Sequence, residues 1–278
     1  MPPFASAVTV SLVPEAKGGP FVFWDGLSDG CARAAEIGFD AVEVFPPSAD
    51  DLDAYQLKHL LEQHRLKLAA VGTGAGWVVQ KLRLTDPDAT IRGRARHFVS
   101  AIVDLAGKLG APAIIGSMQG RVEAGVTRAQ SLAWMAEALE QLGPRAHVYG
   151  VPLLLEPLNR YETNLFNTVD DTVSYLSSLR TRNVKLLCDC FHMNIEEVSI
   201  ADSLRRAGSS VGHVHLADSN RQAAGLGHTD FGAVAQALQD IGYAGYLSAE
   251  VLPLPDSIAA ARQTIAAIRQ LNQAIPSQ

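Results

Sequence analysis

Four side chains that can bind a metal ion end, or nearly end, four successive apolar segments of the sequence. Glu156 ends LLLE, Asp189 ends LLCD, His215 lies in HVHL and Glu250 ends LSAE. Each is roughly 30 residues from the next, the length of one strand–helix–strand repeat. Three carboxylates that meet at one point stay ionised only with a cation among them. If the segments converge, these residues therefore predict a divalent metal site, and oxygen-rich ligation with one imidazole favours Mn²⁺, with Co²⁺ or Mg²⁺ as alternatives.

Further polar residues follow the same segments. His192 comes three residues after the aspartate, and Arg221 and His228 lie in ADSNRQAAGLGHTDF, the glycine-containing stretch after HVHL. We expect His192 in a loop beside the metal, and we expect Arg221 to hold a substrate oxygen or carboxylate. Glu162, six residues after the first glutamate, is either a supporting acid or an exposed loop residue.

Two other titratable residues lie within apolar segments. His213 shares the direction of His215 but lies one layer deeper, so a packed core histidine and a functional one are equally compatible with its position. Glu43, in AVEVF, faces the same opening as the metal residues if that segment is the second strand of a barrel.

The elements that must position these residues are short apolar strands alternating with helices. The strands are continuous and rich in Val, Ile and Leu, as in parallel sheets covered on both faces. Helix-type segments such as IRGRARHFVSAIVDLAGKLG separate them. Eight strand segments are expected: Val8–Val13, Ala41–Phe45, Leu68–Gly72, Ala111–Gly116, Val151–Glu156, Val184–Asp189, Val211–Leu216 and Tyr246–Val251.

Eight such strand–helix units in 278 residues predict an α/β fold, a (β/α)8 TIM barrel. In that fold the carboxyl ends of the strands converge on one opening, where active sites lie. An open doubly wound sheet is the alternative, but VTVSLVPEAKGG carries no glycine-rich phosphate loop after the first strand. No linker or low-complexity stretch divides the chain, so we expect one domain over residues 1–278.

Composition narrows the function classes. Net charge is −6 and 19% of residues are charged, so nucleic acid is not an expected partner. Cys31, Cys188 and Cys190 lack the spacing of a disulfide framework, and we expect packed thiols. The N-terminus does not resemble a signal peptide and no apolar run is long enough to span a bilayer, so we expect no membrane partner and a soluble, cytoplasmic protein.

The sequence motifs resemble those of a known family. EPLNRYETN, DCFHMNIEEV, HLADSNR with GHTDF, and AEVLPLP are similar to segments of the xylose-isomerase-like sugar epimerases, most closely the ketose 3-epimerases and 5-keto-L-gluconate epimerase. The resemblance is dense in the second half of the chain. In the first half it is weaker, over VGTGAGW, TDPD and AIIGSMQGR.

The resemblance implies roles for individual residues. A divalent metal is held by Glu156, Asp189, His215 and Glu250, and the two glutamates also act as the acid/base pair. His192 and Arg221 contact the sugar near O1 and O2, and Glu162 supports the site. Relatives of this type tend to be dimers or tetramers, so a homo-oligomer is expected.

The implied reaction is epimerisation at C3 of a ketose or keto-hexonate. NRYETN, ADSNR and the LPLP ending are most similar to the keto-hexonate branch. The metal polarises the C2 carbonyl and acidifies the C3 proton. One glutamate removes this proton to give a cis-enediolate, and the other returns a proton to the opposite face. A keto acid would need a cation for its carboxylate, and we hypothesise Arg121 as that anchor, with Lys81 and Arg83 as other candidates.

Other functions on the same fold remain open. A metal-dependent aldose–ketose isomerase would exchange the proton at C1 or C2 instead of C3. An abasic-site endonuclease would need more metal ligands and a basic rim, whereas the chain has 8 histidines and a net charge of −6. A sugar-binding barrel without activity would be expected to lack one of the two glutamates.

Overall fold

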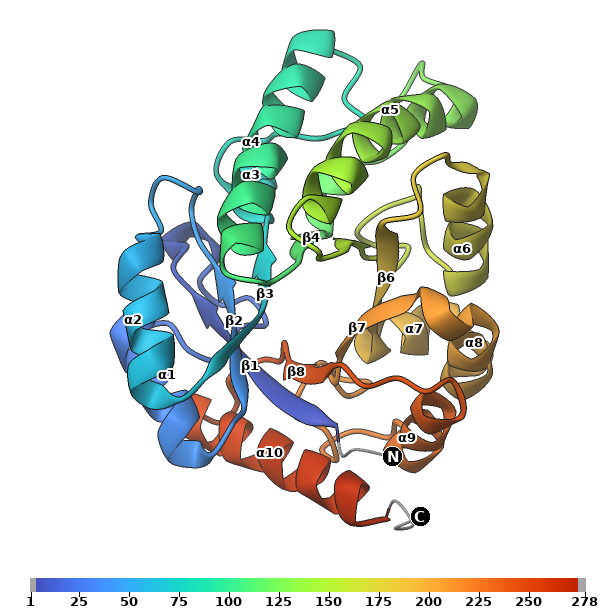
Figure 1. The fold of residues 1–278 in the computed structure, drawn as a ribbon. Helices are drawn as coiled ribbons and strands as arrows, with labels where there is room; N and C mark the ends of the chain where they lie inside the picture. Colours follow the sequence, from blue (N-terminus) through green and yellow to red (C-terminus); the bar gives the residue numbers. More distant parts are fainter. Residues whose placement is uncertain (1–3, 275–278) are drawn as a thin grey trace.

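Eight parallel strands close into a barrel in chain order, with β8 paired to β1. The protein was analysed as a computed structural model, which describes residues 4–274. Figure 1 shows the strands surrounded by helices, the arrangement of a (β/α)8 TIM barrel, so the predicted fold is confirmed. The strands are β1 (Ala5–Ser11), β2 (Ala41–Phe45), β3 (Lys67–Gly72), β4 (Ala113–Ile115), β5 (Leu153–Leu155), β6 (Val184–Asp189), β7 (Val211–His215) and β8 (Tyr246–Ala249).

Helices occupy the connections between the strands. The α-helices are α1 (Leu27–Ile37), α2 (Ala54–His64), α3 (Ala75–Val78), α4 (Ala89–Lys108), α5 (Arg128–His147), α6 (Val169–Ser178), α7 (Cys190–Glu196), α8 (Ile200–Ala207), α9 (Phe231–Asp240) and α10 (Ser257–Ala274). Three short 3-10 turns are η1 (Pro14–Ala16), η2 (Ser117–Gln119) and η3 (Gly208–Ser210). Within residues 4–274, no helix is both long and apolar enough to cross a membrane.

Side chains at the helix starts explain several of these boundaries. The carboxylate of Asp53 accepts hydrogen bonds from two backbone N–H groups at the start of α2. Thr127 and Gln130 form a reciprocal capping box at the start of α5. Asp189 caps α7, because its Oδ1 accepts the backbone N–H of Phe191 at 2.7 Å. A predicted metal ligand therefore also begins a helix, and this helix fixes where His192 lies.

The apolar core has two layers, one outside the strands and one inside. The larger layer packs the outer face of the sheet against the helices and includes all three cysteines, which are buried free thiols. Inside the barrel, a smaller cluster consists of Phe45, Ala70, Ile114, Leu154 and Leu187. Because side chains alternate along a strand, the residue two positions after Leu154 or Leu187 also points inward. The alternation therefore aims Glu156 and Asp189 at the barrel opening.

The predicted strands agree with the observed ones, with shifts at their ends. β2 and β6 have the predicted bounds, whereas β4 and β5 are three residues long. As a result, Glu156 and Glu250 lie one residue beyond β5 and β8, while Asp189 and His215 end β6 and β7. The expectation that His192 lies in a loop was wrong, because α7 starts directly after β6 and buries His192 in its first turn.

Candidate active site

The four predicted metal ligands meet at the carboxyl end of the barrel. One ligand atom from each residue lies within 4.8 Å of the others. Nδ1 of His215 lies 3.4 Å from Glu250, 3.6 Å from Asp189 and 3.9 Å from Glu156. All four residues are buried. The strand ends therefore produce a compact group of three carboxylates and one imidazole, as the spacing predicts.

Unpaired atoms in this group show that it fits a cation. Oε1 of Glu156, Oδ2 of Asp189 and Nδ1 of His215 are buried and have no hydrogen-bond partner among the described residues. A buried polar atom without a partner costs about 1–3 kcal/mol. Oδ1 of Asp189 is used by the α7 cap, so only Oδ2 is free to bind. The donor set, oxygen-rich with one nitrogen, matches a divalent metal ion.

The protein environment shifts the pKa values of Glu156 and Asp189 in opposite directions. Burial and the negative charge of Glu250 raise the pKa of Glu156 well above its usual value. Burial also acts to raise the pKa of Asp189, but the charges of His192, Arg221 and His215 outweigh it and hold this pKa low.

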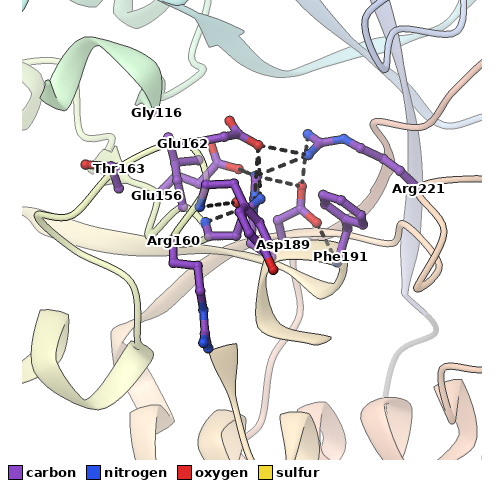
Figure 2. Close-up of polar contacts among 12 residues, drawn as sticks. Gly116, Glu156, Arg160, Glu162, Thr163, Asp189, Phe191 and Arg221 are labelled. Carbon is purple, nitrogen blue, oxygen red and sulfur yellow. Dashed lines mark hydrogen bonds and ion pairs between the residues drawn. The ribbon is translucent and has the colours of Figure 1, made fainter. Parts of the chain in front are cut away.

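Arg221 connects the acids across the cavity. Its Nη2 donates to Oε2 of Glu250 at 2.8 Å, and its guanidinium lies 3.7 Å from both Glu162 and Asp189. The guanidinium also lies over the ring of Phe191, 4.6 Å from the centroid. Figure 2 shows Arg221 reaching toward the acids from the side opposite Glu162. Arg221 thus presents a fixed planar cation beside the ligand group.

One carboxylate holds the loop that carries this arginine. Oδ1 of the buried Asp218 accepts the backbone N–H groups of Ser219 and Thr229, and Oδ2 accepts those of Gly225 and Gly227. Burial opposes ionisation of Asp218, but these four donors outweigh it and lower its pKa. The backbone of Arg221 itself has a φ of 59°, which is unusual for a residue with a side chain. The loop conformation is therefore maintained by the carboxylate of Asp218.

His192 faces the cavity through one ring nitrogen. The backbone N–H of Asn159 donates to Nδ1 at 3.2 Å, which places the proton of the neutral ring on Nε2. Nε2 lies 3.7 Å from Oε1 of Glu156. Burial lowers the pKa of His192. The amide of Asn159 also donates to Glu162 at 3.0 Å, so one asparagine orients both residues.

The cavity above the ligand group has an apolar half. Its volume is about 160 Å³, and the four ligand strands supply its polar side. Over β1–β4 its lining is mainly carbon, including Val13, Phe21, Phe45, Val78 and Ile114. The hydroxyls of Ser11, Thr73 and Ser117 also lie here, and those of Ser11 and Thr73 each have a backbone partner. A ligand that reaches this half meets few polar groups.

Comparison with known proteins places this site in a family. Residues 31–271 match the model of the xylose isomerase-like TIM barrel family. D-psicose 3-epimerase of Ruminiclostridium cellulolyticum is 32% identical over 77% of this chain and 74% of that protein, and L-ribulose 3-epimerase of Methylomonas sp. is 30% identical over 84% and 83%. A crystal structure of D-allulose 3-epimerase from Methylomonas sp. aligns with a TM-score of 0.78 and 25% identity over 97% of this chain and 99% of that one.

The chain belongs to the xylose isomerase-like TIM barrel family. The family resemblance inferred from the motifs is therefore confirmed. The structure brings seven of the site residues expected from the sequence around one point. They line the cavity or join the ligand group: Glu156, Glu162, Asp189, His192, His215, Arg221 and Glu250.

Two expected substrate contacts lie elsewhere. His228 is exposed, its Nδ1 lies 2.8 Å from the hydroxyl of Ser219, and it does not line the cavity. Arg121 lines a neighbouring cavity of about 350 Å³, which shares Ser117, Leu158 and Glu162 with the main one. The cause is the same for both residues, because the direction of a loop side chain is set by its turn and not by strand alternation.

Several residues that shape the site were not expected. Asn159 follows β5 and orients His192, and nothing but its place beside Glu156 distinguishes it in the sequence. Gly116 lies so close to Glu156 that a Cβ there would be 2.5 Å from Oε2. Figure 2 shows Gly116 beside Glu156, and Arg160 pointing away from the acids. Arg160 pairs instead with Glu196 on α7. A glycine after a strand was the available signal for a close approach.

Proposed function

We propose that this protein is a metal-dependent epimerase that inverts C3 of a ketose. The observation that carries the proposal is the approach of two glutamates, Glu156 after β5 and Glu250 after β8, to the same ligand group from different sides of the barrel. Inversion needs one base on each face of the reacting carbon, and this arrangement supplies two. The 3-epimerase relatives support the same reaction class.

The residues have distinct tasks in this reaction. A divalent cation held by Glu156, Asp189, His215 and Glu250 would polarise the C2 carbonyl and acidify the proton on C3. One glutamate removes this proton as the C3–H bond breaks, and the other donates a proton to the opposite face, so that atoms and charge balance. His192 and Arg221 orient the oxygens near C1 and C2.

For the metal we propose Mn²⁺, with Co²⁺ or Mg²⁺ as alternatives, on the basis of the donor set. Removal of the metal with EDTA should abolish turnover, and Mn²⁺ or Co²⁺ should restore it. Turnover that persists after the metal content has fallen to background would contradict metal dependence. Metal content is measured in the same samples by plasma mass spectrometry, so that incomplete removal is recognised.

We propose a neutral ketose in preference to a keto acid. Among residues 4–274, no lysine or arginine lines the half of the cavity over β1–β4, and Arg121 lines the neighbouring cavity instead. A carboxylate in the apolar half would lose its hydration without gaining a partner. We expect Arg121→Ala to leave kcat/KM for a neutral ketose within about twofold, and a selective loss on 5-keto-L-gluconate or tagaturonate would reinstate Arg121 as a carboxylate anchor.

A single experiment tests the reaction and the substrate together. The Mn²⁺-loaded protein is incubated in D₂O with neutral ketoses and keto-hexonates, and proton signals are followed by NMR. Loss of the C3 proton with formation of a new stereoisomer is expected. Exchange confined to C1 or C2 would make the protein an aldose–ketose isomerase, and no exchange with any sugar would contradict the proposal.

We also propose self-association and a cytoplasmic location. Both rest on the sequence resemblance and composition alone. Light scattering after size-exclusion chromatography should give the mass of a dimer or tetramer of the 29.7 kDa chain, and a monomer would contradict this. Fractionation of the source cells tests the location.

A further inference from the structure

A buried carboxylate crosses the barrel interior beneath the ligand group. Glu43 lies on β2 and is fully buried. Its Oε1 lies 2.9 Å from Nε2 of His215, and its Oε2 lies 2.7 Å from Nε2 of His213. Both histidines are on β7, and β8 and β1 separate this strand from β2 in the barrel. One side chain thus connects two strands that do not pair.

We propose that Glu43 is a positioning residue that prepares His215 for the metal. This inference rests on the proposed metal-dependent function. An ionised carboxylate only accepts hydrogen bonds, so the proton of His215 must lie on Nε2. In the neutral ring Nδ1 then presents its lone pair, and this atom faces Glu156, Asp189 and Glu250 without a hydrogen-bond partner among the described residues. A carboxylate on the far nitrogen of a metal-binding histidine fixes its tautomer and ring orientation.

His213 has the matching task of holding Glu43. With both oxygens engaged, the carboxylate cannot rotate away from His215. The two imidazole rings lie edge to face, with centroids 5.4 Å apart and an interplanar angle of 84°. Glu43 and the two histidines also have the composition of a metal site. Distances of 2.7 and 2.9 Å are direct hydrogen bonds, however, and a metal ion would have to stand between these atoms.

The competing explanation is that Glu43 only stabilises the fold. A buried acid between two histidines contributes to stability whether or not a metal binds. The two roles differ in what they change. A positioning role alters metal affinity and the metal's ligand field in a folded protein, whereas a purely structural role alters the unfolding temperature alone.

The test is metal binding by the variant Glu43→Gln. Affinity for Mn²⁺ and Co²⁺ is measured by isothermal titration of the metal-free protein, and the visible absorption of the Co²⁺ form reports ligand geometry. We expect Mn²⁺ binding weakened about 10–100-fold and a shifted Co²⁺ spectrum. At saturating Mn²⁺ much of kcat should return with little change in KM for the sugar.

Thr264→Val is the matched control. Thr264 on α10 is fully buried and donates to the carbonyl of Ala260 at 3.0 Å, so its substitution also removes a buried hydrogen bond. It should lower the unfolding temperature and leave metal affinity unchanged. Wild-type affinity and an unshifted Co²⁺ spectrum in folded Glu43→Gln would overturn the proposal.

A second variant keeps the proposal testable if Glu43→Gln does not fold. His213→Leu removes the donor to Oε2 of Glu43 but leaves the bond between Glu43 and His215 intact. We expect a smaller loss of Mn²⁺ affinity, about threefold to tenfold. Unchanged affinity in this variant would contradict the proposal. Because the readout is metal binding, the outcome is decided even if no sugar is epimerised, in which case only the proposed reaction fails.

Discussion

The two halves of the barrel opening differ in chemistry. Over β5–β8 the residues at the strand ends are charged and lie within a few ångströms of one another. Over β1–β4 the same cavity is lined mainly by carbon, including Phe21, Phe45 and Ile114. In the proposed reaction, the charged half would act on the reacting carbons and the apolar half would contact the rest of the substrate.

Close packing within the barrel produces the apolar half. The ring of Phe45 fits over β3 only because Gly72 has no side chain, since a Cβ there would lie 2.1 Å from the ring. Phe21 packs on Phe45, with ring centroids 4.4 Å apart. A distal hydroxyl of a sugar that enters this half gives up water and finds few partners, at a cost of about 1–3 kcal/mol.

The largest expected effect comes from the charged half. Glu156→Gln and Glu250→Gln each remove an acid/base group without changing side-chain volume. We expect each to lower kcat by about 10²–10⁴-fold, the usual contribution of a general acid or base, with the unfolding temperature nearly unchanged. Turnover is measured at saturating Mn²⁺, so that weaker metal binding does not contribute.

Glu196→Gln serves as the control for these two variants. Glu196 is a glutamate of α7 that pairs with Arg160 outside the cavity, at 2.9 Å. Its substitution should leave kcat within about twofold. Near-normal turnover in either Glu156→Gln or Glu250→Gln would rule out a two-base reaction.

Substitution of Arg221 tests whether turnover depends on a planar cation in the charged half. Its guanidinium reaches Glu250, Glu162 and Asp189 at once, and the ammonium of lysine cannot reproduce this geometry. We expect Arg221→Lys to lower kcat/KM about 10–100-fold, because a hydrogen bond to a charged group contributes about 1.5–3 kcal/mol. Steady-state kinetics measure the change, and a loss below twofold would show that charge alone suffices.

Sequence predicted the charged half and missed the apolar one for a physical reason. Glu156 and Asp189 stand at strand ends, where a polar residue after an apolar run is conspicuous and strand alternation fixes its direction. Phe45 ends β2 and Ile114 lies within β4, and both belong to the cluster inside the barrel. A hydrophobic side chain that lines a cavity and one that fills a core look alike in sequence, however. The pairing of Glu43 with His215 depends on closure of the barrel, which local patterns do not contain.

The apolar half predicts a preference among substrates. A ketose whose terminal carbon is a methyl group should have a kcat/KM about tenfold higher than the same ketose with a terminal hydroxymethyl group, since the methyl group needs no hydrogen-bond partner. Initial rates for a hexulose and its 6-deoxy counterpart of the same configuration measure this ratio. A preference for the hydroxymethyl sugar would contradict the proposed orientation of the substrate.

A substitution in the apolar half of the cavity tests this substrate preference further. Val78→Thr adds a hydroxyl to the apolar half at nearly constant volume and should reduce the preference about threefold. Val148→Thr is the same substitution at a site 80% exposed after α5, and it should leave the ratio unchanged. An equal change of the kcat/KM ratio in both variants would show that Val78 does not contact the terminal carbon of the sugar.

The loop after β7, which carries Arg221, allows a prediction about stability. The folded-state pKa of Asp218 is lowered, so its ionised form stabilises the protein above the unfolded-state pKa of about 3.9, and this contribution is lost as pH falls through the lower, folded-state value. In Asp218→Asn the side-chain NH₂ cannot accept, so two of the four backbone N–H groups lose their partner. We expect about 1–3 kcal/mol less unfolding free energy at pH 7, measured by urea denaturation, and a shallower decline toward pH 2.

The control for Asp218→Asn is Asp53→Asn at the start of α2. Asparagine caps helices about as well as aspartate, so stability should change by less than about 0.5 kcal/mol. If Asp218→Asn instead matched the wild type at every pH, the four hydrogen bonds would contribute nothing net to folding. The φ of 59° at Arg221 would then need another cause, such as the hydrogen bond from the backbone N–H of Leu252 to the Arg221 carbonyl at 2.8 Å.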